Sequence, residues 1–394
     1  MLLYNKNIQE SSTLKINTIA NKKKNLGETV YNFSVGEPVI DNSKIIVDNV
    51  CGILKQNRAK YPPPVGVNEL VDLAKEWFNN NFNCHYNNKE VMITCGGKYA
   101  ISLSLQAVLD HNDEVIIISP YWVSYPEMIK IFGGQPKVLI TSEEDSWYLD
   151  VSKLEKIINS KTKAIIINNG SNPTGHLFAQ EELEKILECA HKHNLYIISD
   201  EVYSGLTFDD NVFISSGLYE KYKEKLIIVQ SCSKNFGMTG WRVGMIFSSQ
   251  EIIKCLTVLQ SQSITNTSIV SQWAAIEAIR HAEGITEDIR KTIQKRRDVF
   301  VETFNELFPV KIKPPQSTLY AFVKVSNLGV VNKKSDDFAE DLIDRANVAV
   351  TPGKDFGDDN YIRFSFGVSE DEIKKGLNVL KKFVDNYNQH LSCE

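Results

Sequence analysis

Short runs of β-branched residues alternate with longer amphipathic stretches from about Val91 to about Phe247. Three of the stretches, residues 100–110, 180–193 and 250–260, carry apolar side chains at helical spacing. The apolar runs have the length and composition of strands buried on both faces, and they span residues 90–94, 114–119, 137–140, 163–168, 195–199, 226–230 and 243–247. This alternation predicts an α/β fold in which helices cover both faces of a parallel sheet.

The segments outside this alternation have a different pattern. The first forty-odd residues indicate an arm and a turn-rich stretch, and from about Lys311 shorter strand and helix patterns indicate a separate α+β unit. We expect two domains that share the chain ends. Residues 1–45 would form an N-terminal arm and part of the small domain, residues 46–305 a large domain, and residues 306–394 the C-terminal small domain. The Asn-rich residues 79–88 are expected to form a polar connector.

Composition and charge narrow the class of protein. A chain of 394 residues with a formal net charge of −5 is long enough for large buried cores and does not favour a nucleic-acid-binding protein. No apolar stretch approaches the roughly 18 residues of a membrane span, and the N-terminus lacks a signal-peptide pattern, so we expect a cytoplasmic protein. The seven cysteines are scattered without a Cys-x-x-Cys pair, which favours reduced thiols over a disulfide framework or a metal site.

The candidate functional residues follow the apolar runs, because ligands of open α/β sheets bind outside the carboxyl ends of the strands. Each residue alone has a plain structural explanation: a tight turn for the glycines, a helix cap for the aspartate, an exposed side chain for the lysine. Together they offer a phosphate cradle, a stacking ring, an amide, a carboxylate, a phenol and an amine, which suit a flat heteroaromatic aldehyde with a phosphate. These residues are Gly96, Gly97, Lys98, Trp122, Asn172, Asp200, Tyr203, Ser231, Ser233, Lys234 and Arg242.

An ordered set of motifs carries a resemblance to a known family. The set comprises Asn172-Pro173-Thr174-Gly175, Asp200-Glu201-Val202-Tyr203, and Ser231-x-Ser233-Lys234 followed by Met238-Thr239-Gly240-Trp241-Arg242-Val243-Gly244. With Gly36-Glu37-Pro38, Tyr61 and Arg363, it resembles the class I aminotransferases, pyridoxal-phosphate enzymes of fold type I, over nearly the whole chain. The likeness is greatest to the bacterial aspartate/prephenate aminotransferase branch. It implies a large domain with a mostly parallel seven-stranded sheet, and a smaller α+β domain.

The resemblance also implies a role for each candidate residue. Lys234 would hold pyridoxal 5′-phosphate covalently and then act as the base at the substrate Cα, while Asp200 would pair with the pyridine nitrogen. Asn172 and Tyr203 would hydrogen-bond the ring O3′, and Trp122 would stack on the ring. The remaining roles are binding of the phosphate by Ser231, Ser233, Arg242, the Gly96-Gly97-Lys98 turn and Tyr61 from a second subunit of a homodimer, and binding of the substrate α-carboxylate by Arg363 and Gly36.

The choice of substrate depends on fewer residues. In the resembling branch, the lysine that corresponds to Lys98 and the arm hydroxyls that correspond to Ser11 and Thr13 help to bind a distal carboxylate. This suggests aspartate, glutamate or prephenate as the substrate. The chain departs from the family pattern at three positions, Gly170, Ser317 and Leu319, where relatives usually have proline, glycine and an aromatic residue. An aromatic or specialised amino acid is therefore an alternative substrate.

Two further alternatives belong to other functional classes. A pyridoxal-phosphate lyase would use the same lysine, aspartate and arginine. A ligand-sensing regulator would need a DNA-binding module, and the chain has no spare segment long enough to contain one.

Overall fold

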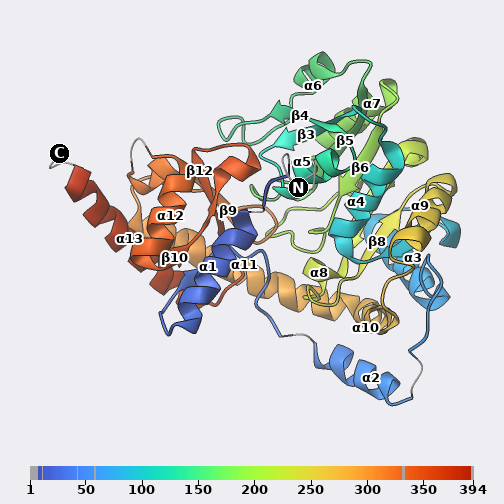
Figure 1. Ribbon diagram of the computed structural model, residues 1–394, viewed down its shortest axis with the longest axis horizontal. Helices are drawn as coiled ribbons and strands as arrows, with labels where there is room; N and C mark the ends of the chain where they lie inside the picture. The colour runs from blue at the N-terminus through green and yellow to red at the C-terminus, as the bar shows by residue number, and fades with distance from the viewer. Residues whose placement is uncertain (1–7, 11, 42, 57–58, 331–332, 392–394) are drawn as a thin grey trace, which may run out of the picture.

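A seven-stranded sheet forms the centre of the computed structural model, which describes residues 8–10, 12–41, 43–56, 59–330 and 333–391 (Figure 1). The strand order is β2-β8-β7-β6-β5-β3-β4. All neighbours are parallel except β8, which runs antiparallel to both β2 and β7. All seven predicted strands are present, as β2 (Val91–Thr94), β3 (Glu114–Ser119), β4 (Gln135–Ile140), β5 (Thr162–Asn168), β6 (Tyr196–Asp200), β7 (Leu226–Ser231) and β8 (Gly244–Phe247).

Alternate residues of the strands contribute to two hydrophobic cores, one on each face of the sheet. In β5, Ile165 and Ile167 pack into one core, and Ala164 and Ile166 into the other. The predicted helices are confirmed as α4 (Gly96–Val108), α7 (Gln180–Lys192) and α9 (Gln250–Ser263). Helices α4, α9 and α5 (Ser124–Ile131) cover one face, and α7, α3 (Asn68–Phe82), α6 (Val151–Ile157) and α10 (Ile269–Arg280) cover the other.

The prediction that all seven strands are buried on both faces is wrong for β4. This strand lies at the edge of the sheet beside β3, and several of its side chains face solvent, with Val138 42% and Ile140 72% exposed. An apolar run does not show whether a strand has neighbours on both sides.

A smaller antiparallel sheet has the order β11-β12-β9 and consists of β9 (Tyr320–Lys324), β11 (Thr351–Pro352) and β12 (Tyr361–Ser365). Beside it, β1 (Tyr31–Asn32) pairs in parallel with β10 (Val348–Ala349), so the two ends of the chain share this part of the structure. A third core joins these strands to α12 (Ser335–Ala346), α13 (Glu370–Leu391) and α11 (Ala282–Leu307). The exact domain boundaries at residues 45 and 305 stay a prediction.

The remaining helices complete the chain. Helix α1 (Ser12–Asn25) lies beside α12 and β10, α2 (Lys44–Leu54) packs against α10, and α8 (Cys232–Asn235) follows β7. Short 3-10 helices span Asn88–Glu90, Ser216–Leu218, Glu220–Lys225, Val325–Leu328 and Gly353–Phe356. No helix in the described part of the chain is long and apolar enough to cross a membrane. The six cysteines within that part are all free thiols.

The Asn-rich segment is only partly a connector. Helix α3 continues to Phe82, and the Asn79 side chain then caps the turn by accepting from Tyr86 N at 3.0 Å and donating to Tyr86 O at 2.9 Å. Cys84 and Tyr86 are buried. Asparagine side chains can replace backbone hydrogen bonds at a turn, so an Asn-rich sequence here forms a packed corner and not a loose connector.

Candidate active site

A cavity of about 400 Å³ opens at the carboxyl ends of the central strands. Because β5, β6 and β7 are adjacent and parallel, the residues that follow them meet at one edge of the sheet. Strand β8 runs the other way, with Gly244 opposite Ser231, so Arg242 precedes it at the same edge. The predicted residues that line the cavity are Thr13, Gly36, Gly97, Lys98, Trp122, Asn172, Asp200, Tyr203, Ser231, Ser233, Lys234, Arg242 and Arg363.

Three predicted residues are not in this lining. Gly96 lies against the Arg242 guanidinium, since a Cβ at Gly96 would be 2.4 Å from Arg242 Nη2. Tyr61 is 91% exposed and lies outside the cavity of this chain, so its contribution from a second subunit stays a prediction. Ser11 lies outside the described residues.

Lys234 projects from the one-turn helix α8 into the cavity, and its Nζ donates a hydrogen bond to Gly36 O. Burial lowers the pKa of the Lys234 amine, and the positive charges of Arg363 and Arg242 lower it further, against the opposing effects of Tyr320 and Glu37. A neutral amine is the form that acts as a nucleophile or a base. The site therefore favours the reactive form of this lysine.

Asp200 ends β6 and is 3% exposed. Tyr125 Oη donates to Asp200 Oδ2 at 2.6 Å, and Val202 N donates to Oδ1 at 3.4 Å. Burial raises the pKa of Asp200 to about 6, although both hydrogen bonds act to lower it. A buried carboxylate that has no cation beside it in the described structure is suited to hold one from a ligand.

Asn172 and Tyr203 are held by a chain of polar contacts. Asn168 Oδ1 accepts from Asn172 N at 2.8 Å, while Asn168 Nδ2 donates to Asp200 O at 3.0 Å. The turn of Asn172 is thereby fixed to β6. Tyr203 shares a hydrogen bond of 2.9 Å with the Tyr320 hydroxyl, which comes from β9 of the smaller sheet.

Apart from Tyr61, the residues predicted to bind phosphate lie around the N-terminus of α4. Gly96 has φ +81°, and a Cβ at Gly97 would be 3.0 Å from Val202 Cγ1, so both positions favour glycine. Ser231 Oγ accepts from Ser233 N at 3.1 Å and donates to Val243 O at 3.2 Å. The exposed backbone N–H groups of a helix N-terminus, two hydroxyls and a guanidinium together form an anion site.

Arg363 in β12 is a buried cation, 2% exposed. Nη2 donates to Ser34 O at 2.7 Å and to Thr351 Oγ1 at 3.3 Å, and Nη1 donates to Asn172 Oδ1 at 3.2 Å. Its Nε has no hydrogen-bond partner, and none of the described carboxylates pairs with it. The guanidinium lies 4.2 Å from the centre of the Tyr320 ring.

A second buried arginine shows what usually accompanies such a charge. The Arg297 side chain is 3% exposed and forms ion pairs with Asp209 at 2.7 Å and with Asp298 at 2.6 Å. Burial of an unpaired charge is costly, and an anionic ligand at Arg363 would supply the missing partner. The geometry suits the carboxylate of a substrate.

Lys98 is a further cation in the wall of the cavity. Its Nζ lies 5.0 Å from the centre of the Trp122 ring, and both side chains line the cavity. Burial lowers the pKa of Lys98, and the charge of Arg242 lowers it further. Thr13 reaches the same cavity from α1.

The sequence did not point to Tyr125 or Tyr320 as site residues, although both lie in stretches that resemble the family. Their hydroxyls contact Asp200 and Tyr203, and these contacts depend on how α5 and β9 pack against the sheet. Glu37 is a third such residue: it accepts from the Thr239 hydroxyl, and both residues line the cavity.

Comparison with known proteins decides the family. The family model for aminotransferase class I and II matches residues 25–380. The chain belongs to the class I and II aminotransferases. This aminotransferase is 33% identical to the aspartate aminotransferase of Bacillus subtilis over 381 residues, 96% of this chain and 97% of the relative. It is also 33% identical to the aspartate/prephenate aminotransferase of Thermus thermophilus over 373 residues, 94% and 95% of the two chains.

A solved structure agrees with this membership. The aspartate aminotransferase from Thermus thermophilus with maleate matches with a TM-score of 0.91 at 31% identity, over 97% of this chain and 99% of that chain. Fold type I and an α/β large sheet are therefore confirmed, and the protein is a transaminase similar to aspartate aminotransferases.

The family implies pyridoxal 5′-phosphate as the cofactor of this aminotransferase. The cavity fits that group on its own chemistry. A reactive amine at Lys234, a buried carboxylate at Asp200 and an anion site at the N-terminus of α4 lie around one space, with the Trp122 ring in its wall. These are the partners that the aldehyde, ring nitrogen, phosphate and ring face of the cofactor require.

Proposed function

We propose that this aminotransferase exchanges the amino group between aspartate or glutamate and the matching 2-oxo acids, oxaloacetate and 2-oxoglutarate. The carrying observation is the pair of cations in one cavity, Arg363 and Lys98, neither of which forms an ion pair within the described residues. A dicarboxylic substrate has one carboxylate for each. The names of the Bacillus subtilis and Thermus thermophilus relatives support the same substrate class.

In the proposed mechanism, Arg363 binds the substrate α-carboxylate through its free Nε and an Nη group, and Lys98 with Thr13 and Ser11 binds the distal carboxylate. The bound cofactor supplies an electron-withdrawing ring that makes the substrate Cα–H acidic. Lys234 Nζ would be the base that takes the proton from the substrate Cα and returns it during the transfer. Gly36 O, which accepts from Lys234 Nζ, orients the amine.

The other residues act on the cofactor side. Asp200 would pair with the protonated ring nitrogen, and the hydrogen bond from Tyr125 holds the carboxylate in place. Asn172 and Tyr203, which line the same cavity, would hydrogen-bond the ring oxygen, and the Trp122 ring would stack on the cofactor. The site that combines the N-terminus of α4 with Ser231, Ser233 and Arg242 would hold the phosphate, an attachment that does not depend on Lys234.

The half-reaction tests this proposal directly. Purified enzyme loaded with pyridoxal phosphate is mixed with one amino acid at a time, without any acceptor, and the absorption change from the aldehyde to the amine form of the cofactor is followed. We expect aspartate and glutamate to convert it at least about tenfold faster than alanine, because a charged hydrogen bond contributes roughly 1.5–3 kcal/mol. Faster conversion by tyrosine or phenylalanine would refute the dicarboxylate assignment.

Two arms separate the alternatives. Prephenate offered as the acceptor to the amine form tests the second activity named for the Thermus thermophilus relative. Release of ammonia with an oxo acid, without accumulation of the amine form, would identify a lyase on the same fold.

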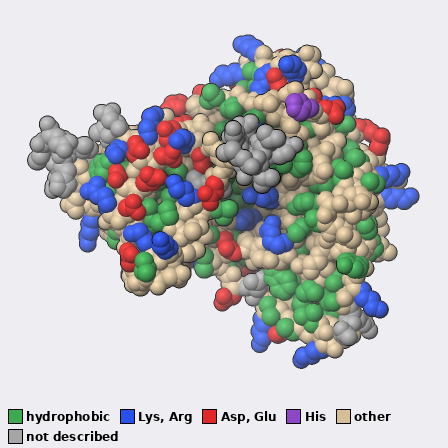
Figure 2. Space-filling model, viewed as in Figure 1, with side chains coloured by type: hydrophobic (Ala, Val, Ile, Leu, Met, Phe, Trp, Pro, Cys, Tyr) green, Lys and Arg blue, Asp and Glu red, His purple; other side chains and the backbone are tan. Residues whose placement is uncertain are grey.

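We further propose a homodimer in the cytoplasm, with Tyr61 of one chain completing the phosphate site of the other. Tyr61 is 91% exposed in the single chain, and Figure 2 shows hydrophobic side chains gathered over α2, where Ile45, Val47 and Leu54 are exposed. Light scattering should give the mass of two chains at micromolar concentration. A monomer that retains full activity would contradict the shared site.

A further inference from the structure

The two departures from the family pattern at Gly170 and Ser317 are in contact. A Cβ built on Gly170 would be 1.9 Å from Ser317 Oγ and 2.7 Å from Ser317 Cβ, and its next neighbour, Leu177 Cδ2, is at an ordinary 3.4 Å. Gly170 does not have a positive φ, so glycine is not required there by a left-handed backbone conformation. The Ser317 side chain occupies the space that a Cβ at Gly170 would need.

Ser317 is also hydrogen-bonded to the turn that follows Gly170. Its Oγ donates to Gly175 O at 2.9 Å, and its backbone N donates to the same oxygen at 3.1 Å. The side chain is fully buried. Gly175 has φ +73°, and a Cβ there would be 2.6 Å from Pro315 Cβ, so the turn and the segment 315–317 are in close contact.

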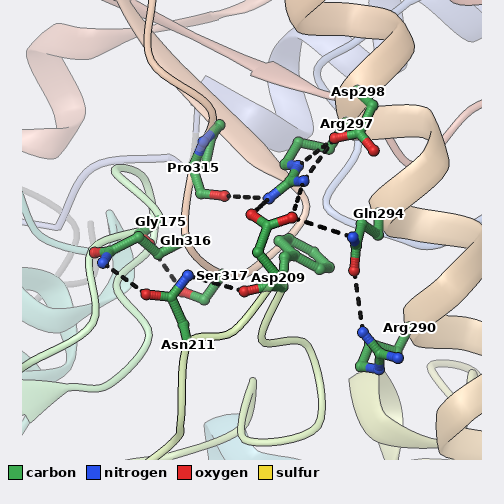
Figure 3. Close-up of polar contacts among 11 residues, drawn as sticks. Gly175, Asp209, Asn211, Arg290, Gln294, Arg297, Asp298, Pro315, Gln316 and Ser317 are labelled. Atoms are coloured by element: carbon green, nitrogen blue, oxygen red, sulfur yellow. Dashed lines mark hydrogen bonds and ion pairs between the residues drawn. The ribbon is translucent and has the colours of Figure 1, made fainter.

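The opposite side of that segment is held as well. Figure 3 shows Pro315, Gln316 and Ser317 between Gly175 on one side and Asp209 with Arg297 on the other. Arg297 Nη1 donates to Pro315 O at 3.2 Å, and Ser317 forms an isolated antiparallel bridge with Thr207. The segment is therefore fixed from two directions.

This segment leads directly to the substrate side of the cavity. Three residues after Ser317, Tyr320 enters β9, where its ring lies 4.2 Å from the Arg363 guanidinium. Two residues after Gly170, Asn172 accepts from Arg363 Nη1. Ser317 thus joins the two segments that contact Arg363, although neither Ser317 nor Gly170 lines the cavity.

We propose that Ser317 is a positioning residue of this aminotransferase, which fills the space above Gly170 and holds the turn of Asn172 and the strand of Tyr320 in register around Arg363. The inference rests on the proposed role of Arg363 in binding the substrate carboxylate. The two departures from the family pattern then compensate each other, because the side chain of Ser317 fills the space that the absence of a side chain at Gly170 leaves.

The experiment combines an unfolding cycle with ligand affinity. Gly170→Ala should lower the melting temperature of the wild type by several degrees, because Ser317 must move. In the Ser317→Gly background, where the space is free, the same change should lower the melting temperature by at most half as much. Ser317→Ala should weaken binding of the fastest amino donor, and of the unreactive dicarboxylate maleate, by about fivefold, the effect of one lost buried hydrogen bond. The limiting rate of the half-reaction should change by less than about twofold.

Ser248→Ala is the matched control. Ser248 is a fully buried serine whose Oγ donates to the backbone carbonyl of Leu226 at 2.7 Å, at the amino end of β7 and away from the cavity. It should leave both affinities unchanged. If Gly170→Ala lowers the melting temperature equally in the wild type and in Ser317→Gly, Gly170 and Ser317 are not a compensating pair. If Ser317→Ala binds the donor and maleate as tightly as the wild type, Ser317 is not a positioning residue. The unfolding cycle needs no turnover, so failure of the pair is distinguishable from failure of the proposed function, which would show as no conversion of any donor by the wild type.

Discussion

Lys234→Ala should reduce amino transfer by at least about 10⁴-fold, because the variant loses both the covalent attachment and the base at the substrate Cα. Lys234 contributes little to the stability of the fold, because its Nζ donates a hydrogen bond to Gly36 O and the helix that carries it is a single turn. We therefore expect the fold to persist. Stopped-flow measurement of the half-reaction gives the rate, and circular dichroism checks the fold.

Lys225→Ala is a suitable control for Lys234→Ala, since Lys225 Nζ also donates to a backbone carbonyl, that of Asn194, at 2.8 Å, but at the amino end of β7. It should retain wild-type rates. Borohydride treatment followed by peptide mass analysis should add the cofactor to Lys234 in the wild type and to no peptide in Lys234→Ala. Substantial residual transfer by this variant would remove Lys234 from the mechanism.

Asp200→Asn should reduce the rate by about 10³-fold and weaken cofactor binding, because the amide keeps the shape of the side chain but removes the charge that pairs with the ring nitrogen. The wild type should show a matching pH effect. Burial raises the pKa of Asp200 to about 6. As the pH falls through that value the carboxylate takes up a proton and becomes neutral, so cofactor affinity should fall on the acid side.

Fluorescence titration with pyridoxal phosphate between about pH 5 and pH 8 measures this affinity. In Asp200→Asn the acid-side loss should disappear along with most of the affinity. An Asn variant with the wild-type rate and the wild-type pH profile would show that the negative charge is not required.

Where residues follow strands, the sequence predicted which of them lie together at the cavity. Asn172, Asp200 and Lys234 come after three apolar runs, and adjacent parallel strands necessarily bring such positions together. The sequence did not predict contacts between segments that are far apart in the chain. Tyr125 contacts Asp200 from a helix 75 positions earlier, and the hydroxyl of Tyr320 contacts Tyr203 across 117 positions.

Strand direction was likewise absent from the pattern. The run at 243–247 has the same composition as its neighbours, yet β8 is antiparallel, and only this reversal places Arg242 at the edge where Ser231 lies. The contact between Gly170 and Ser317 is a further example, since each was recognised as unusual but nothing in the sequence joined them.

The exposed edge strand β4 has a consequence for solubility. The open edge of a strand with apolar side chains such as Ile140 can pair with the sheet of another molecule and start aggregation. Two residues of β4 oppose this: Pro136 has no N–H to offer to an incoming strand, and Lys137 places a charge there while it pairs with Glu114 at 2.7 Å. The outer edge of β4 is thus protected by two side chains that take no part in catalysis. Replacing both with valine would promote the assembly of fibres and leave the activity of the folded enzyme unchanged.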